Sequence, residues 1–138
     1  MRTRLLVALL AVIVTAGVLV LKLKTNINWD KLQSIEVYTD STVGENFEKM
    51  SDMDLSGKEH YKLDIEQAKP ILKRAKTEVQ LLTIWKSYKY AVAHFSEGKP
   101  LRMKISDYGG FFLILNYGRK YQVRESDIEA WEKLWATY

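Results

Sequence analysis

The sequence predicts an α+β domain that follows an N-terminal transmembrane helix, and three observations support this fold class. An apolar run opens the chain, four strand-like segments separated by glycine-containing turns fill much of the second half, and a helix with two tryptophans on one face ends it. Turns this short join only antiparallel neighbours. We therefore expect a four-stranded antiparallel meander packed against the C-terminal helix and one preceding helix.

The apolar run is long enough to cross a bilayer. Residues 5–23 carry a single charge and follow Arg2 and Arg4; as a helix they would measure about 28 Å, against a hydrocarbon core of about 30 Å. We predict that residues 1–24 form an uncleaved anchor. The alternatives are a signal peptide cut after Ala16, where the preceding residues loosely fit a cleavage site, and a buried helix of a soluble fold. The apolar run continues past Ala16, which favours the anchor.

Charges beside this segment predict its orientation. Arg2, Arg4 and the amino terminus precede it, and Lys22 and Lys24 follow it. Three positive charges thus precede the segment and two follow it. By the positive-inside rule this excess places the amino terminus in the cytoplasm and favours an extracytoplasmic body. The chain has no cysteine, so it has neither disulfides nor a lipid-bearing thiol. We divide the chain into the anchor and a single small α+β domain over residues 25–138, which is long enough for one core and too short for two.

Charge is segregated along the body. Residues 36–66 hold nine acids against three lysines, whereas residues 69–124 hold twelve bases against three acids. Within one domain such blocks either neutralise each other across the fold or present a basic surface to an anionic partner.

The first half of the body contains short elements. Residues 34–39 alternate apolar and polar side chains and predict a strand, residues 58–63 predict another, and the acidic segment between them is loop-like. Four apolar residues could fix this loop to the body: Phe47, Met50, Met53 and Leu55. Before these elements, Trp29 is expected at the membrane interface as an aromatic anchor.

A helix is predicted after the second of these strands. Asp64 is a suitable N-cap, but Pro70 either kinks the first turn or starts the helix itself, so both versions give a helix over 70–77. Its core-facing residues would be Ile65, Ala68, Leu72, Ala75 and Val79.

The C-terminal half gives the clearest pattern. Strands are predicted at residues 88–96, 101–106, 111–116 and 119–124. Ser126 and Glu129 fit a capping box, and the helix that follows places five apolar residues on one face: Ile128, Trp131, Leu134, Trp135 and Tyr138.

Alternation in two of these strands predicts a basic surface. Arg102, Lys104, Lys120 and Arg124 lie opposite the apolar rows and would share the open face of the sheet. They are our candidate binding residues for an acidic protein, lipid headgroups or an anionic envelope polymer; the alternative is an ordinary solvated face. Nucleic acid is not expected, because the body is tethered to a membrane and lacks the stacking pattern of an RNA-binding sheet.

No metal, cofactor or catalytic site is predicted. Asp52, Asp54 and Ser56 occupy the first three ligand positions of a calcium loop, but position 12 is Leu63, so we expect an acidic turn. Neither histidine has a second ligand at zinc spacing. His94, on a predicted strand, is the best candidate for a general base.

We therefore expect a non-enzymatic, single-pass membrane protein whose extracytoplasmic body is a binding or accessory module. It would contact lipid through residues 1–24 and an acidic or anionic partner through the body. The alternatives are a small enzyme using His94 and a structural subunit of a membrane complex.

Overall fold

A computed structural model of the chain describes residues 2–44, 46–78 and 87–136, and it leaves undescribed the side chains of residues 2, 17–25 and 136. Its helices are α1 (Arg2–Thr25), α2 (Asp52–Ser56), α3 (Ile65–Arg74) and α4 (Ile128–Ala136), with 3-10 turns η1 (Trp29–Lys31) and η2 (Glu125–Asp127). Its strands are β1 (Leu32–Tyr38), β2 (His60–Lys62), β3 (Lys76–Thr77), β4 (Tyr88–Phe95), β5 (Leu101–Ser106), β6 (Phe111–Ile114) and β7 (Arg119–Gln122).

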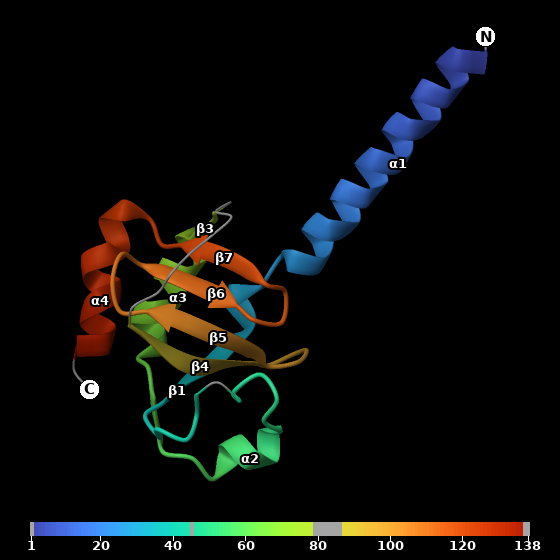
Figure 1. Cartoon of the computed structure of the whole chain (residues 1–138). Coiled ribbons are helices and arrows are strands. Elements are labelled where there is room, and N and C mark those ends of the chain that lie inside the picture. The colour runs from blue at the N-terminus through green and yellow to red at the C-terminus, as the bar shows by residue number, and fades with distance from the viewer. Residues whose placement is uncertain (1, 45, 79–86, 137–138) are drawn as a thin grey trace.

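The α+β class is confirmed, but the sheet is larger than predicted. All seven strands form one antiparallel sheet in the order β2-β1-β4-β5-β6-β7-β3, with the helices arranged around it (Figure 1). The meander β4–β7 is as expected, and the strands predicted at residues 34–39 and 58–63 form as β1 and β2. The prediction of a four-stranded sheet was wrong, because β1, β2 and β3 belong to the same sheet. The other three strands pair across long stretches of chain, which local spacing does not reveal.

Strand β3 occupies the last residues of the helix that was predicted over residues 70–77. Asp64 caps α3 as expected, its carboxylate accepting a hydrogen bond from the Glu66 backbone N–H. Pro70 lies inside the helix rather than starting it. The helix stops at Arg74, because the chain becomes extended at Ala75 and Lys76–Thr77 then pairs with β7. The prediction of helix over residues 75–77 was therefore wrong.

The main core lies between one face of the sheet and helices α3 and α4. Ala68, Ile71 and Leu72 of α3 are buried there, whereas the predicted core position Val79 lies outside the described residues. Trp131 of α4 is fully buried. The rest of its predicted face agrees: Leu134 and Trp135 are buried and Ile128 is partly buried, while Tyr138 lies outside the described residues.

Trp29 belongs to this core and not to a membrane interface. It is only 8% exposed and packs against Phe95 and Phe112, with ring centroids 5.8 and 6.4 Å away. An indole suits both environments, so the aromatic partners brought by β4 and β6 decide its position.

A second, smaller cluster lies on the opposite face of the sheet. Phe47 and Leu55 of the acidic segment pack there with Tyr38, Val43 and Val92. Of the four anchors predicted for this segment, Phe47 and Leu55 are buried, Met50 is partly buried and Met53 is 85% exposed. The acidic segment therefore covers the part of this face around β1 and β4.

Helix α1 projects away from the body as a single rod (Figure 1). Its described side chains, residues 3–16, are all exposed. Among the described residues, no helix meets the length and hydropathy needed to span a bilayer. Much of the predicted anchor, including residue 1 and the side chains of residues 17–24, lies outside that description.

Candidate functional site

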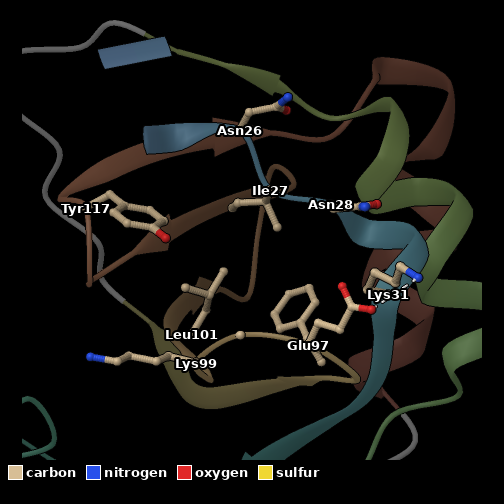
Figure 2. Close-up of a pocket in the computed structure, with 10 residues that line it drawn as sticks. Asn26, Ile27, Asn28, Lys31, Glu97, Lys99, Leu101 and Tyr117 are labelled. Atoms are coloured by element: carbon tan, nitrogen blue, oxygen red, sulfur yellow. Dashed lines mark ion pairs between the residues drawn. The ribbon is translucent and has the colours of Figure 1, made fainter. Parts of the chain in front are cut away.

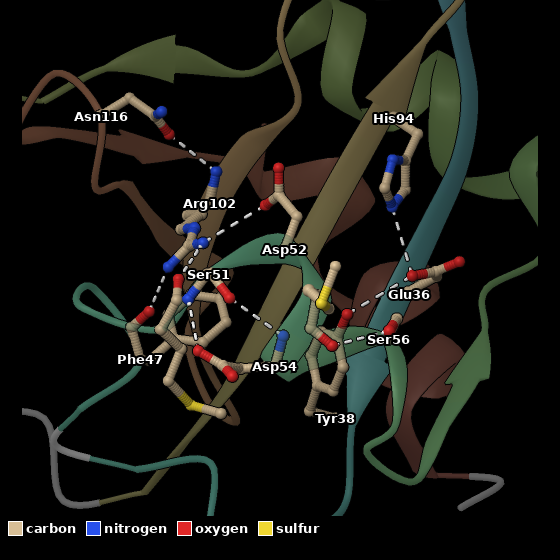
Figure 3. Close-up of polar contacts among 12 residues, drawn as sticks. Glu36, Tyr38, Phe47, Ser51, Asp52, Asp54, Ser56, His94, Arg102 and Asn116 are labelled. Atoms are coloured by element: carbon tan, nitrogen blue, oxygen red, sulfur yellow. Dashed lines mark hydrogen bonds and ion pairs between the residues drawn. The ribbon is translucent and has the colours of Figure 1, made fainter.

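Arg102, a candidate binding residue, holds the acidic segment against the sheet. Its guanidinium donates hydrogen bonds to the backbone carbonyls of Phe47 and Met50 and lies 3.3 Å from a carboxylate oxygen of Asp52 (Figure 3). The same group lies over the Phe47 ring, 5.3 Å from its centroid. Its side chain is 17% exposed. Arg102 thus joins the basic block of the sequence to the acidic one.

The three candidate calcium ligands, Asp52, Asp54 and Ser56, all lie on the short helix α2. Ser51 and Asp54 form a capping box at the start of α2, in which each side chain accepts a hydrogen bond from the other residue's backbone N–H. Asp52 faces Arg102, and the Ser56 hydroxyl donates to the Met53 carbonyl. In the part of the chain that the structure describes, no group of three or more acidic or histidine side chains is arranged to hold a metal ion.

Lys104 and Lys120 lie in one row across the sheet, on either side of Leu113. Strand register pairs Lys104 with Leu113 and Leu113 with Lys120. The structure therefore places these two cations and Arg102 on the same face, opposite the main core. Strand alternation predicts this shared face, because side chains two residues apart lie on the same face. The prediction that the face is open was wrong for Arg102, which the acidic segment covers, and for Lys120, which is 8% exposed.

Both lysines of this row have aromatic contacts. The Lys104 ammonium lies 3.7 Å from the centroid of the Tyr88 ring, and that of Lys120 lies 4.1 Å from the centroid of the Phe111 ring. Lys120 is 8% exposed and forms an ion pair with Glu78 at 3.8 Å. Its charge is thus neutralised within the fold.

The prediction that Arg124 shares the sheet face of the other three candidate cations was wrong, because β7 ends at Gln122. Arg124 follows β7 at the N-cap position of η2, where its side chain makes no capping hydrogen bond, and it is exposed. Of the four candidates it offers the most accessible charge.

The two histidines of the sequence converge on one carboxylate, which local sequence does not predict. His94 Nε2 lies 3.2 Å from one Glu36 oxygen, and His60 Nε2 lies 3.9 Å from the other. The Tyr38 hydroxyl donates to Glu36 at 3.4 Å, and burial together with that carboxylate raises the pKa of Tyr38 to about 12 (Figure 3). Pairing of β1 with both β2 and β4 brings these four side chains together.

Glu36 can orient the imidazole of His94. In the tautomer with the proton on Nε2, the His94 ring donates a hydrogen bond to the Glu36 carboxylate, and Nδ1 remains free to act as a proton acceptor. This carboxylate–histidine pair resembles the base and its orienting group in acid–base enzymes. Among the contacts that the structure describes for His94, the one with Glu36 is what favours a role as a general base.

A pocket of about 220 Å³ opens where α1 joins the body. Its walls come from the segment after α1, the β4–β5 turn and the β6–β7 turn (Figure 2). Its polar residues are Asn26, Asn28, Lys31, Glu97, Lys99 and Tyr117, and its apolar residues include Ile27, Phe95 and Leu101. The Lys31 ammonium lies 3.8 Å from the Glu97 carboxylate, so both signs of charge are present.

Sequence reasoning misses this pocket because its walls come from three segments that are far apart in the chain. The only local indication is the charged Glu97-Gly98-Lys99-Pro100 turn, which by itself predicts no site. No protein-family model, curated protein or solved structure matches the chain, so the geometry described above is the basis for any functional assignment.

Proposed function

We propose that this protein is a membrane-anchored binding or accessory module whose folded body lies on the extracytoplasmic side. The observation that carries the proposal is an apolar helix, α1, exposed beside a body that buries its own core. Between Leu5 and Val14, eight Leu, Val and Ile side chains are each 58–77% exposed. Because each side chain is about two-thirds exposed, moving all eight out of water would contribute roughly 8–15 kcal/mol, at about 1–2 kcal/mol for each.

The body does not need these side chains. Its main core is formed by residues from Trp29 to Trp135, and none of the described α1 side chains contributes to it. A bilayer can accommodate a solitary apolar helix without a protein partner, because the backbone groups between the two ends of the helix bond one another and the ends lie at the polar interfaces.

Membrane extraction tests the anchor. The full chain, expressed in cells, should stay in the membrane pellet after alkaline carbonate washing. The double variant Leu9→Arg/Ile13→Arg should move to the supernatant, because a charge near the bilayer centre costs about 2.5–3.5 kcal/mol. The matched control Leu9→Val/Ile13→Val should remain in the pellet. Release of the unmodified chain by carbonate would refute the anchor, and an intact mass lacking residues 1–16 would show a cleaved signal instead.

A topology reporter tests the extracytoplasmic location. Fused after residue 138, a reporter active only outside the cytoplasm should give signal, and one active only inside should not. The reverse pattern would refute this part of the proposal. Replacing residues 1–24 by an unrelated anchor tests the alternative that the protein is a structural subunit of a membrane complex. A binding module should still co-purify with its partner protein after this replacement, whereas a subunit held in its complex by the helix should lose it.

A second candidate function is acid–base catalysis at His94, favoured by its contact with Glu36 at 3.2 Å. The experiment is a panel of ester, amide, glycoside and phosphoester substrates, assayed with the full chain and with His94→Gln and His60→Gln. The enzyme hypothesis predicts that one of these substrates is turned over and that His94→Gln abolishes the activity without changing the melting temperature, whereas His60→Gln retains it. This result would refute the proposal of a non-enzymatic binding module.

A further inference from the structure

The pocket at the foot of α1 is held close to the point where the helix leaves the body. Only Asn26 separates the end of α1 at Thr25 from Ile27, which packs against the main core. The next residues are also fixed: Asn28 accepts a hydrogen bond from the Asp30 backbone N–H, and Trp29 is buried. Two residues of extended chain span at most about 7 Å. If α1 lies in a bilayer, this tether holds the pocket at the level of the lipid headgroups.

The size of the pocket suits a small polar group. At about 220 Å³ it is below the 300–1,000 Å³ typical of sites for drug-sized ligands. Ile27, Phe95 and Leu101 provide an apolar wall, and the polar groups lie around it (Figure 2). Such a site can hold a charged headgroup while the apolar wall contacts the adjoining glycerol and upper acyl carbons.

The charges of the pocket match a headgroup that carries both signs. Lys31 and Lys99 supply ammonium groups, and Glu97 supplies a carboxylate. The Lys31 and Glu97 side chains are 47% and 77% exposed and 3.8 Å apart. An exposed pair of this kind contributes at most about 1 kcal/mol. A ligand that offers a phosphate to Lys31 and an ammonium to Glu97 can therefore replace this ion pair at low cost.

We propose that this pocket binds the phosphoethanolamine headgroup of a phospholipid in the leaflet next to the body. This inference rests on the proposed membrane anchoring. The primary ammonium of ethanolamine donates N–H hydrogen bonds to Glu97, and its phosphate accepts from Lys31 beside that carboxylate. Lys99 lies on the opposite side of the pocket and adds positive charge there (Figure 2). Choline has no N–H to donate, and phosphoglycerol offers Glu97 neutral hydroxyl groups in place of an ammonium, so each makes a weaker contact with that carboxylate. The pocket thus selects ethanolamine over both.

Lipid competition on the full chain tests the selection. The protein, reconstituted in nanodiscs containing equal amounts of phosphatidylethanolamine, phosphatidylcholine and phosphatidylglycerol, is released into mild detergent and its retained lipids are identified by native mass spectrometry. We expect phosphatidylethanolamine to be retained at least threefold over each competitor. Glu97→Gln should reduce this ratio to about one, because a charge-assisted hydrogen bond is lost. Glu48→Gln, an exposed glutamate outside the pocket, is the matched control and should keep the ratio.

Each other outcome overturns the inference in a recognisable way. Preferential retention of phosphatidylglycerol that is insensitive to Glu97→Gln would show that only the lysines attract lipid. Equal retention of all three lipids by a chain that resists carbonate extraction would refute the pocket while leaving the anchor intact. A chain that does not enter nanodiscs would refute the anchor itself. Since Glu97 is a highly exposed turn residue, tryptophan fluorescence should show that its variant is folded.

Discussion

Replacing Arg102 by methionine should detach the acidic segment from the sheet. The guanidinium donates to two backbone carbonyls of that segment, at Phe47 and Met50, and contacts the Asp52 carboxylate (Figure 3). Methionine keeps most of the apolar stem, so the change mainly removes the charged donor.

The expected loss follows from these contacts. A hydrogen bond from a charged donor contributes about 1.5–3 kcal/mol net, and two part-buried carbonyl acceptors lose their partner together. Because water can reach part of the site once the segment loosens, we expect a total loss of about 2–4 kcal/mol. Asp52 is 82% exposed, and an exposed ion pair contributes about 0.2–1 kcal/mol. The carbonyl bonds should therefore account for most of the effect.

Urea unfolding of the full chain in mild detergent, followed by tryptophan fluorescence, measures this loss. With a slope of about 2 kcal/mol per molar urea, the middle of the range for small domains, the midpoint for Arg102→Met should fall by roughly 1–2 M. Asp52→Asn should shift it much less, and Arg102→Lys should lie between the two, because a single ammonium cannot reproduce the fork of donors. Equal shifts for Arg102→Met and Asp52→Asn would refute the reasoning.

Two further predictions concern other parts of the fold. Gly110 has a φ of +70°, and a Cβ there would overlap a Val123 methyl; Gly110→Ala should therefore cost about 2–4 kcal/mol. Gly118→Ala, at a φ of +59° with open space around it, should cost only about 1–2 kcal/mol; equal losses in melting temperature would contradict the overlap. Arg74 donates two hydrogen bonds of 2.9 Å to Asp127 and holds the pKa of that carboxyl below its ordinary 3.8. The stabilisation from this ion pair is present above the unfolded-state pKa of Asp127 and is lost as pH falls through its folded-state pKa. The difference in urea midpoint between the unmodified chain and Arg74→Met should therefore be larger at pH 7 than at pH 3. An equal difference at both pH values would contradict this link.

Local sequence predicts the features that depend on near neighbours. Glycines between short alternating segments give the β4–β7 meander, and Asp64 identifies the start of α3. Alternation also places Arg102, Lys104 and Lys120 on the face of the sheet opposite the main core. These features are local because turn conformation, capping and strand alternation act over a few residues.

The sequence by itself determined the α+β class, the meander, the shared face of Arg102, Lys104 and Lys120 and the apolar character of the first segment. Only the tertiary structure decided what covers each face: whether Trp29 meets lipid or core, and whether Arg102 faces a partner or the chain's own carbonyls. It also brought Glu36 to His94 and assembled the pocket at the foot of α1. The physical reason is that these contacts join residues tens of positions apart. Which distant segments pair is set by the total burial and hydrogen bonding of the fold, and local spacing does not encode that choice.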